Sequence, residues 1–380
     1  MKADLRRFFT GRLDEMARLA RELVEMESPT TVKFTVDRLV ERVAEELAAC
    51  GADMIIHPRE EVGDIIEARW HTDQPGAPLL LLCHLDTVHP IGAAERNPVR
   101  LEDDRLYGPG SYDMKGGVAT VLSAISGLHE LGLFPERPII ALMTTDEETG
   151  SFYSRDLIQQ VAEGAALAMV MEAALPDGSL KTWRKAVGRY TVRTYGSSAH
   201  AGGAHEHGVN AIEEMAHQIV RLQQMTDYSR GTTVNVGIIN GGTRTNVIPD
   251  MCEAQVDVRA MTVAEMDRLH EQVMALQPVL DGARLEISGG FDRPPMERNA
   301  LMIETFQRAQ QIAAGYGLTL KEAGTGGGSD GNYTAAIGTP TLDGLGPLGD
   351  GAHTDREFLY VPSMADSATL IAALMLEWPG

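Results

Sequence analysis

The spacing of hydrophobic and polar positions changes along the chain and divides it into two kinds of segment. In the first half, helical patterns alternate with short runs that are apolar throughout, at residues 79–83, 139–143 and 167–171. Runs without polar alternation are typical of strands buried on both faces, as in a mostly parallel sheet flanked by helices. Residues 1–185 are therefore predicted to form the first part of an α/β catalytic domain.

From residue 186 the predicted strands alternate instead, which indicates one buried and one solvated face. Val234, Val236 and Ile238 fall on one face of one strand, and even-numbered residues of 252–258 on one face of another. With two amphipathic helical stripes, the order is β-α-β-β-α-β, which predicts a ferredoxin-like unit over residues 186–293. A helical pattern and a short strand then follow, so residues 294–380 are predicted to complete the catalytic domain around this insertion.

Composition and charge exclude several classes of protein. The chain has 33 Lys plus Arg against 54 Asp plus Glu, a formal net charge of −21. This charge repels phosphate backbones and anionic lipid head groups, so neither nucleic acid nor a membrane is expected as a partner. The cysteines Cys50, Cys83 and Cys252 are too scattered for a disulfide framework. Because the N-terminal residues alternate charged and apolar positions at helical spacing, we expect an amphipathic helix and a cytoplasmic protein.

Residues that can bind a metal follow each of the three apolar runs. They are His84 and Asp86, then Glu147 and Glu148, then Glu172. Ligand sites in α/β sheets form at the carboxyl ends of parallel strands, so these side chains are expected to converge. Clustered carboxylates repel one another unless a cation lies between them. Imidazole and carboxylate ligands suit zinc, with cobalt or manganese as substitutes.

Spacing within these segments suggests how the side chains divide their roles. His84 and Asp86 project to the same side of an extended segment, so Asp86 is predicted to orient a metal-binding His84 by a hydrogen bond. In an extended chain Glu147 and Glu148 point apart, which allows one to bind metal and the other to act as a general base. Each motif alone is more often structural, as a turn histidine with a capping Asp or a solvated helix start. Their joint occurrence at three strand ends favours the metal site.

Several longer segments resemble one known family in order and spacing. They are LLLCHLDTVHP, GPGSYDMKGG, TTDEETGS, Glu172 after an apolar strand, and GDGAHTDREFL. The resemblance is to the co-catalytic dizinc metallopeptidases that include glutamate carboxypeptidase, succinyl-diaminopimelate desuccinylase, acetylornithine deacetylase and aminoacylase. It implies two zinc ions and a catalytic domain with an inserted lid and dimerisation domain. A homodimer through that inserted domain is also implied.

The resemblance further implies a set of catalytic residues. One zinc ligand set is His84, Asp113 and Glu172, and the other is Asp113, Glu148 and His353. In this arrangement Asp113 bridges the two ions, Glu147 is the general base and Asp86 supports His84. The Asp113–Met114 peptide is expected to be cis.

Substrate-binding residues are implied in the inserted domain and in the glycine-rich segment. His200 in GSSAHAG is expected to reach the partner subunit's active site and help to hold the oxyanion, although without the motif a hydrogen-bonded turn histidine is the commoner interpretation. Asn246 and Arg259 are expected to bind the free carboxylate of the substrate, although a surface arginine is the default for Arg259. The resemblance also implies that the backbone of the glycine-rich segment lines the substrate pocket, and this segment contains Gly327, Gly328 and Ser329.

The predicted function is a zinc-dependent hydrolase that cleaves an amide bond to an amino acid with a free carboxylate, as a glutamate carboxypeptidase-like exopeptidase does. An N-acyl-amino-acid deacylase, such as a deacetylase or desuccinylase, or a related amidohydrolase is the alternative. A metal-binding protein without catalysis is a further alternative, but a pure metal-binding protein has no evident need for Glu147. The sequence departs from the family pattern in having His205 where many relatives have proline.

Overall fold

The computed structural model describes residues 2–379, with side chains from Asp4 onward. It separates into two compact units. The first comprises Met1–Trp183, Arg298–Gly324 and Ser329–Gly380, and the second comprises Arg184–Glu297 with Thr325–Gly328. The sequence places residues 325–328 in the C-terminal part of the catalytic domain, whereas in the structure this stretch clusters with the second unit.

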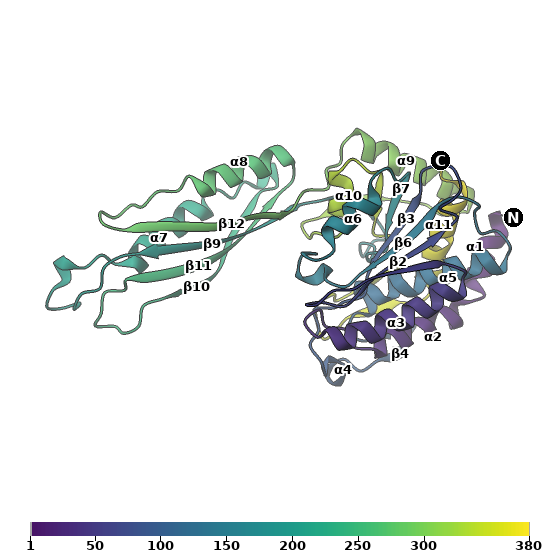
Figure 1. Ribbon diagram of the computed structural model, residues 1–380, viewed down its shortest axis with the longest axis horizontal. Helices are drawn as coiled ribbons and strands as arrows, with labels where there is room; N and C mark the ends of the chain where they lie inside the picture. Colours follow the sequence, from purple (N-terminus) through teal and green to yellow (C-terminus); the bar gives the residue numbers. More distant parts are fainter. Residues whose placement is uncertain (1, 380) are drawn as a thin grey trace. The chain divides into compact units, whose positions relative to one another are not determined.

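The first unit contains an eight-stranded sheet with the order β1-β2-β6-β3-β7-β14-β8-β13 (Figure 1). Its strands are β1 (Asp53–His57), β2 (Ile65–Trp70), β3 (Leu79–His84), β6 (Ile139–Thr144), β7 (Leu167–Val170), β8 (Leu180–Arg184), β13 (Glu322–Thr325) and β14 (Thr341–Asp343). The four central strands β6, β3, β7 and β14 run parallel, while β2 and β8 join them antiparallel. The parallel region is therefore the centre of the sheet, where the apolar runs lie.

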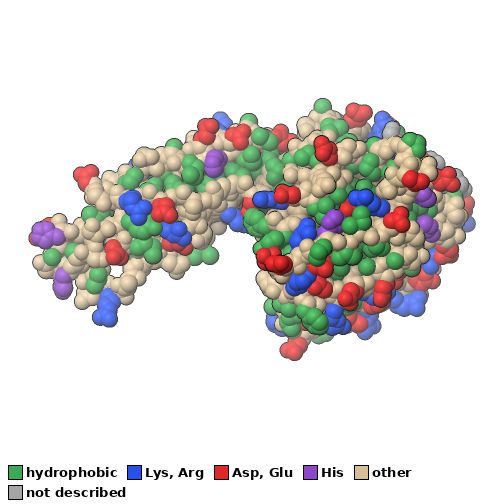
Figure 2. Space-filling model, in the orientation of Figure 1, with side chains coloured by type: hydrophobic (Ala, Val, Ile, Leu, Met, Phe, Trp, Pro, Cys, Tyr) green, Lys and Arg blue, Asp and Glu red, His purple; other side chains and the backbone are tan. Residues whose placement is uncertain are grey.

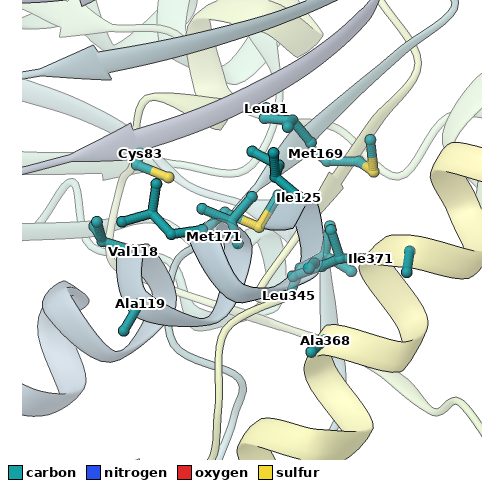
Figure 3. Close-up of a cluster of buried hydrophobic side chains, with 14 of the residues drawn as sticks. Leu81, Cys83, Val118, Ala119, Ile125, Met169, Met171, Leu345, Ala368 and Ile371 are labelled. Atoms are coloured by element: carbon teal, nitrogen blue, oxygen red, sulfur yellow. The ribbon is translucent and has the colours of Figure 1, made fainter. Parts of the chain in front are cut away.

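Both faces of this sheet are buried, which explains the absence of polar alternation in its central strands. Leu79, Leu81 and Cys83 of β3 join one apolar cluster, and Leu80 and Leu82 join another on the opposite face. Figure 3 shows part of the first cluster, where Leu81 and Cys83 meet side chains of two helices. A polar residue at any of these positions would lose its hydration without a partner.

Helices cover the two faces of the sheet (Figure 1). Those that contribute to the first cluster are α1 (Lys2–Thr10), α2 (Leu13–Glu25), α3 (Lys33–Ala49), α5 (Gly116–Glu130), α9 (Ala300–Gly315) and α11 (Ser363–Glu377). Those that contribute to the second are α6 (Arg155–Ala162) and α10 (Gly331–Ala336). Among the described residues, no helix combines the length and the apolar character needed to cross a bilayer.

A small second sheet in the first unit joins segments that are distant in sequence. It has the order β15-β16-β5-β4, built from β4 (Arg100–Glu102), β5 (Arg105–Tyr107), β15 (Gly349–Asp350) and β16 (Phe358–Tyr360), and the short helix α4 (Ala93–Arg96) precedes it. Because β16 pairs with β5, the segment that contains His353 is held next to the segment that leads to Asp113.

The second unit has the predicted β-α-β-β-α-β order. Its elements are β9 (Ala186–Tyr195), α7 (Ala211–Gln223), β10 (Thr233–Gly241), β11 (Met251–Ala260), α8 (Val263–Met274) and β12 (Arg284–Arg293). The sheet order β10-β11-β9-β12, with antiparallel pairs throughout, is that of a ferredoxin-like unit. The alternate buried positions of β11 pack with both helices in one core.

One predicted position in this unit is wrong. Ile238 was expected on the buried face with Val234 and Val236, but it is 58% exposed whereas Val234 is 5% exposed. The register of β10 against β11 shifts between Val236 and Ile238, which marks a bulge. An extra residue in one strand reverses the alternation beyond it, and a pattern read from the sequence alone does not show where that occurs.

Figure 2 shows acidic and basic side chains interspersed on the visible face of each unit. Basic side chains on that face do not gather into one patch.

Candidate metal centre

The carboxyl ends of β3, β6 and β7 bring the first predicted ligands together. His84 is the last residue of β3, Glu148 lies in a short turn after β6, and Glu172 follows β7. Because β3 pairs in parallel with both β6 and β7, the segments after these strands leave the sheet at the same edge. Asp113 reaches this edge from the turn before α5, and His353 from the loop between β15 and β16.

The five predicted ligands form two groups that share Asp113. Nε2 of His84 lies 3.2 Å from Oδ1 of Asp113 and 3.4 Å from Oε1 of Glu172. Nε2 of His353 lies 3.3 Å from Oδ2 of Asp113 and 3.2 Å from Oε2 of Glu148. In each group the candidate ligand atoms lie within 4.8 Å of one another. Asp113 therefore presents one oxygen to each group, which is the geometry of a bridging carboxylate.

The electrostatics of these groups favour a cation. Burial raises the pKa of Glu148 to about 8, although its hydrogen bond with His353 acts in the opposite direction. Burial alone would also raise the pKa of Asp113, but hydrogen bonds with His353 and His84 hold it well below its usual range. Hydrogen bonds to Asp113 and Glu148 raise the pKa of His353 to about 11. The imidazoles thus supply positive charge to the carboxylates, and a bound dication would supply the same charge.

The donor set also fits a metal ion in its chemistry. Imidazole nitrogens and carboxylate oxygens are ligands that zinc accepts. Oε1 of Glu148 is buried and has no hydrogen-bond partner. A buried carboxylate oxygen without a donor is costly, and a bound cation would satisfy it. These residues therefore fit two metal ions.

Asp86 supports both His84 and the turn after β6. Its Oδ1 lies 3.4 Å from Nδ1 of His84, and the backbone oxygen of Asp86 lies 3.1 Å from the same nitrogen. Its carboxylate also accepts the backbone N–H groups of Glu147 at 3.3 Å and Glu148 at 3.2 Å, and the hydroxyl of Thr30 at 2.6 Å. One buried carboxylate thus orients the imidazole of His84 and fixes the position of Glu148.

Glu147 and Glu148 do not lie in an extended segment, which corrects the conformation expected from the sequence. They begin a 3-10 turn, Glu147–Thr149. Successive residues of such a turn are rotated by about 120°, so the two side chains still diverge. Glu148 belongs to the second group, whereas Glu147 belongs to neither group and its residue is 8% exposed.

The predicted oxyanion residue His200 and carboxylate-binding residue Asn246 lie on adjacent loops of the second unit. The backbone oxygen of Asn246 accepts the N–H of Ala201, and both predicted side chains are exposed. Nδ1 of His200 accepts the backbone N–H groups of Gly202 at 3.1 Å and Gly203 at 3.0 Å. A neutral imidazole that accepts at Nδ1 carries its proton on Nε2, so His200 presents an N–H donor.

Arg259, also in the second unit, is held in a fixed orientation. Its guanidinium donates to both carboxylate oxygens of Asp257, each at 2.8 Å, and lies 3.4 Å from the backbone oxygen of Gly326. Gly327 and Gly328 belong to the same unit, and their backbone oxygens accept hydrogen bonds from Arg184.

Ser329 differs from the other predicted substrate-binding residues. It belongs to the first unit and is completely buried, and its hydroxyl donates to Asp343 at 2.5 Å. The same hydroxyl accepts the backbone N–H of Gly331 at 3.0 Å, so this side chain stabilises the start of α10. The side chain of Ser329 therefore faces the interior, and the expectation that the backbone of the glycine-rich segment lines the pocket stays a prediction.

Two residues next to the predicted ligands are not identified from the sequence. Nζ of Lys181 lies 3.7 Å from Oε2 of Glu172, and Lys181 is only 8% exposed. Glu357 accepts the backbone N–H of Asp113 at 2.9 Å and is fully buried. Lys181 lies inside a strand where periodicity gives no chemical signal. Glu357 lies in the same segment as His353, so its acidic side chain within that motif was the available signal.

Comparison with known proteins identifies the class to which this fold and site belong. The sequence model of peptidase family M20/M25/M40 matches residues 80–377. The chain belongs to this family of hydrolases, which confirms the resemblance inferred from the motifs. The Asp113–Met114 peptide is cis, as that resemblance implies.

Two proteins of known name and one solved structure show how similar this chain is to individual relatives. Carboxypeptidase G2 of Pseudomonas sp. (strain RS-16) is 32% identical over 307 residues, which cover 80% of this chain and 74% of the relative. Acetylornithine deacetylase of Klebsiella pneumoniae (strain 342) is 31% identical over 265 residues, which cover 63% of this chain and 67% of the relative. The solved structure of Bacillus subtilis YxeP, described as a dinuclear metal-binding M20 peptidase, has a TM-score of 0.68 at 16% identity and covers 98% of this chain and 99% of that one. At this identity the structural likeness shows the fold alone.

Proposed function

We propose that the chain is a dizinc metallo-carboxypeptidase that cleaves an amide bond to an amino acid with a free carboxylate. The observation that carries this proposal is the pair of ligand groups that share Asp113. The similarity to carboxypeptidase G2 supports the glutamate carboxypeptidase-like assignment. One zinc ion would be held by His84, Asp113 and Glu172, and the other by Asp113, Glu148 and His353. Cobalt or manganese are substitutes with compatible ligand preferences.

The two cations, when bound, would lower the pKa of a water molecule and polarise the scissile carbonyl. Glu147 accepts the proton of the attacking water and returns it to the departing amine. Its exclusion from both ligand groups supports this role, because its carboxylate is not needed for metal binding. Asp86 holds Nδ1 of His84 and so directs Nε2 toward the first ion.

Residues of the second unit are proposed to recognise the substrate. The guanidinium fork of Arg259 suits a carboxylate, and its pairing with Asp257 keeps that fork oriented. Asn246 and the backbone of Gly327, Gly328 and Ser329 are proposed to complete carboxylate binding. The Nε2–H of His200 is the proposed donor to the oxyanion of the tetrahedral intermediate.

A homodimer through the second unit, which would also act as a lid, is part of this proposal. Strand β10 is at an edge of its sheet, and Ile238 and Ile239 are 58% and 49% exposed. An edge strand with exposed apolar side chains is a favourable place for pairing with a second copy. In a dimer, His200 of the partner subunit would serve the active site. A strictly monomeric protein by light scattering, with full activity, would contradict the dimer.

The cytoplasm is the proposed location. All three cysteines are free thiols, as a reducing compartment favours. This proposal does not affect the assignment of the reaction.

An N-acyl-amino-acid deacylase is the second candidate, because acetylornithine deacetylase matches at 31% identity. Both candidates use the same metal centre and differ in the acyl group released. A panel of dipeptides, N-acetyl and N-succinyl amino acids and their carboxyl-amidated analogues distinguishes them when products are read by mass spectrometry. Hydrolysis of peptides supports the carboxypeptidase, whereas release of acetate or succinate alone supports the deacylase.

The base assignment is tested in the same assay with Glu147→Gln. We expect turnover to fall by about 10²- to 10⁴-fold while the metal content stays unchanged. Glu163→Gln, at an exposed glutamate after α6, is the matched control. Metal-loaded wild-type protein that hydrolyses no compound of the panel would contradict the proposed function.

A further inference from the structure

We propose that Glu357 is a positioning residue that fixes Asp113 relative to His353, with His89 holding the Glu357 carboxylate in place. The inference rests on the proposed function and its metal centre. Glu357 belongs to neither of the two ligand groups of that centre. Glu357 contacts neither a predicted metal position nor a substrate group, and it acts through the backbone of the Asp113 turn.

The carboxylate of Glu357 is fully buried and accepts four hydrogen bonds. Oε1 accepts the backbone N–H groups of Tyr112 and Asp113, each at 2.9 Å. Oε2 accepts the backbone N–H of Gly110 at 2.9 Å and lies 2.7 Å from Nε2 of His89. Each oxygen therefore binds the turn of residues 110–113, and one of them also binds the segment that follows Asp86.

The backbone of this turn presents several N–H donors to the Glu357 carboxylate. Three of its N–H groups converge on this carboxylate at the start of the short helical segment Ser111–Lys115, where no preceding turn of helix offers a carbonyl acceptor. Converging backbone N–H groups form a cradle for negative charge. Gly110 has a left-handed φ of 72°, and a Cβ there would lie 2.6 Å from Cγ2 of Thr87. A glycine is therefore needed where the turn packs against Thr87 and directs its N–H to Glu357.

The backbone of Glu357 is tied to the same region. Its carbonyl oxygen accepts the side-chain amide of Asn97 at 3.1 Å and the N–H of Gly108 at 3.3 Å. Strand β16 begins at the next residue and pairs with β5. Because His353 lies in the loop before Glu357, a shift of this residue changes the distance between His353 and Asp113. Both belong to the second ligand group, so that group is the one expected to respond.

The test is Glu357→Gln, which replaces one carboxylate oxygen with an NH₂ group. In either orientation the amide places a donor against N–H donors of the turn. We expect the affinity for the second metal ion to fall about 10- to 100-fold, as for other residues that orient ligands. kcat is expected to fall by a similar factor, while KM changes less than about threefold. Cobalt titration followed by visible absorption, with elemental analysis of folded protein, measures the two affinities.

A second readout uses metal-free protein. Amide hydrogen exchange at Tyr112 and Asp113 is expected to be at least about tenfold faster in Glu357→Gln than in the wild type, because these N–H groups lose their acceptor. This measurement does not depend on metal binding. If the wild type fails to bind two ions, the proposed function fails, whereas the exchange result still tests the role of Glu357 in fixing the turn.

Glu67→Gln is the matched control. Glu67 is also a buried carboxylate of the first unit, and it binds His57 at 2.8 Å and Arg69 at 2.7 Å. This variant is expected to lower the melting temperature while leaving the metal affinities and the exchange of the Asp113 turn unchanged. If Glu357→Gln also changes only the melting temperature, Glu357 is a stabilising residue and the proposal is overturned.

Substitutions at His89 test the same positioning role if the Glu357→Gln variant does not fold. His89→Ala removes the donor to the carboxylate, whereas the amide of His89→Gln can replace it. We expect weakened second-site metal binding in His89→Ala and substantial recovery in His89→Gln. Equal affinities in the wild type and both variants would overturn the role of His89 and the linkage proposed through Glu357.

Discussion

The central sheet of the first unit is buried on both faces, whereas the sheet of the second unit is buried on one face and accessible on the other. All six residues of β3 and all six of β6 are buried, whereas buried residues alternate along β11. Charged groups at the ends of β3 and β6 are consequently buried too, among them His84 and Asp86. In the second unit, pairs such as Arg193 and Glu253 remain on the more accessible side of the sheet.

This difference separates buried ionisable residues, which need an ion-pair partner or a cation, from exposed residues, which can bind a substrate. Buried ionisable groups are stable only when they are paired or bind a cation. Their concentration at one edge of the first sheet therefore indicates a functional centre. Exposed ion pairs contribute little to stability, so the open face of the second sheet tolerates residues kept for recognition. We expect substitutions at this edge of the first sheet to affect turnover. Substitutions on the sheet of the second unit should instead affect substrate affinity or stability.

Asp113→Ala should have the largest effect on activity, because this residue contributes one carboxylate oxygen to each ligand group. Metal ions contribute several kcal/mol of transition-state stabilisation, so we expect kcat/KM to fall by about 10³-fold or more. Elemental analysis should show less than one tightly bound ion per chain. Asp156→Ala, at an exposed residue of α6, is the control. Retention of two ions and of near-normal turnover would remove the basis for treating the edge of the first sheet as the functional centre.

Asp86→Asn should have an intermediate effect of about 10- to 100-fold on kcat/KM and on zinc affinity. An asparagine amide cannot accept both backbone N–H groups that Asp86 now binds, at Glu147 and Glu148. Zinc affinity is measured by competition with a chelator. Asp37→Asn is the matched control, because Asp37 accepts a backbone N–H from Asp64 at 2.8 Å away from the ligand groups. Equal losses in the two variants would assign the effect to general destabilisation.

The sequence predicts those parts of this centre that follow a regular pattern. The buried strands and the residues directly after them were identified because an apolar run is a local signal, and the carboxyl ends of parallel strands meet. Asp113 and His353 lie in irregular segments without periodicity, so only their family motifs revealed them. Glu357 was missed because its meaning depends on N–H groups 244 to 247 positions away in the chain. Local patterns cannot predict such a contact.

In the second unit too, features that depend on contacts between distant residues could not be predicted from the sequence. Its element order was predicted because alternation and helical stripes are each visible over a few residues. The bulge at Ile238 was not, since it depends on how β10 pairs with β11. In the first unit, the burial of the Ser329 side chain is not predicted either, because a glycine-rich segment gives no indication of which residues face the interior.

Arg259→Ala tests the recognition role of the second unit. A hydrogen bond to a charged group contributes about 1.5–3 kcal/mol, so KM for substrates with a free carboxylate should rise about 10- to 100-fold. Carboxyl-amidated analogues should be hydrolysed at an unchanged rate by the variant. Arg193→Ala is the control, since it also removes an arginine paired with an acid on the same sheet. An equal effect on both kinds of substrate would show that Arg259 supports the fold instead.

Glu265→Gln should have the smallest effect and should change stability without changing turnover at pH 7. Hydrogen bonds with Arg268 and Thr232 lower the pKa of Glu265 to about 2, although burial acts in the opposite direction. Because the folded pKa lies below the ordinary value, the carboxylate stabilises the fold above about pH 4.5, and this contribution is lost as the pH falls toward 2. Arg268 is 34% exposed, so solvent screening limits the contribution to about 1–2 kcal/mol. The free energies of unfolding in urea of the wild type and the variant should therefore differ at pH 7 and converge near pH 2.

Glu271→Gln, at an exposed position of the same helix, is the control. Its free energy of unfolding should equal that of the wild type at both pH values. A gap that persists undiminished at pH 2 would mean that the packing of Glu265, and not its charge, stabilises the second unit.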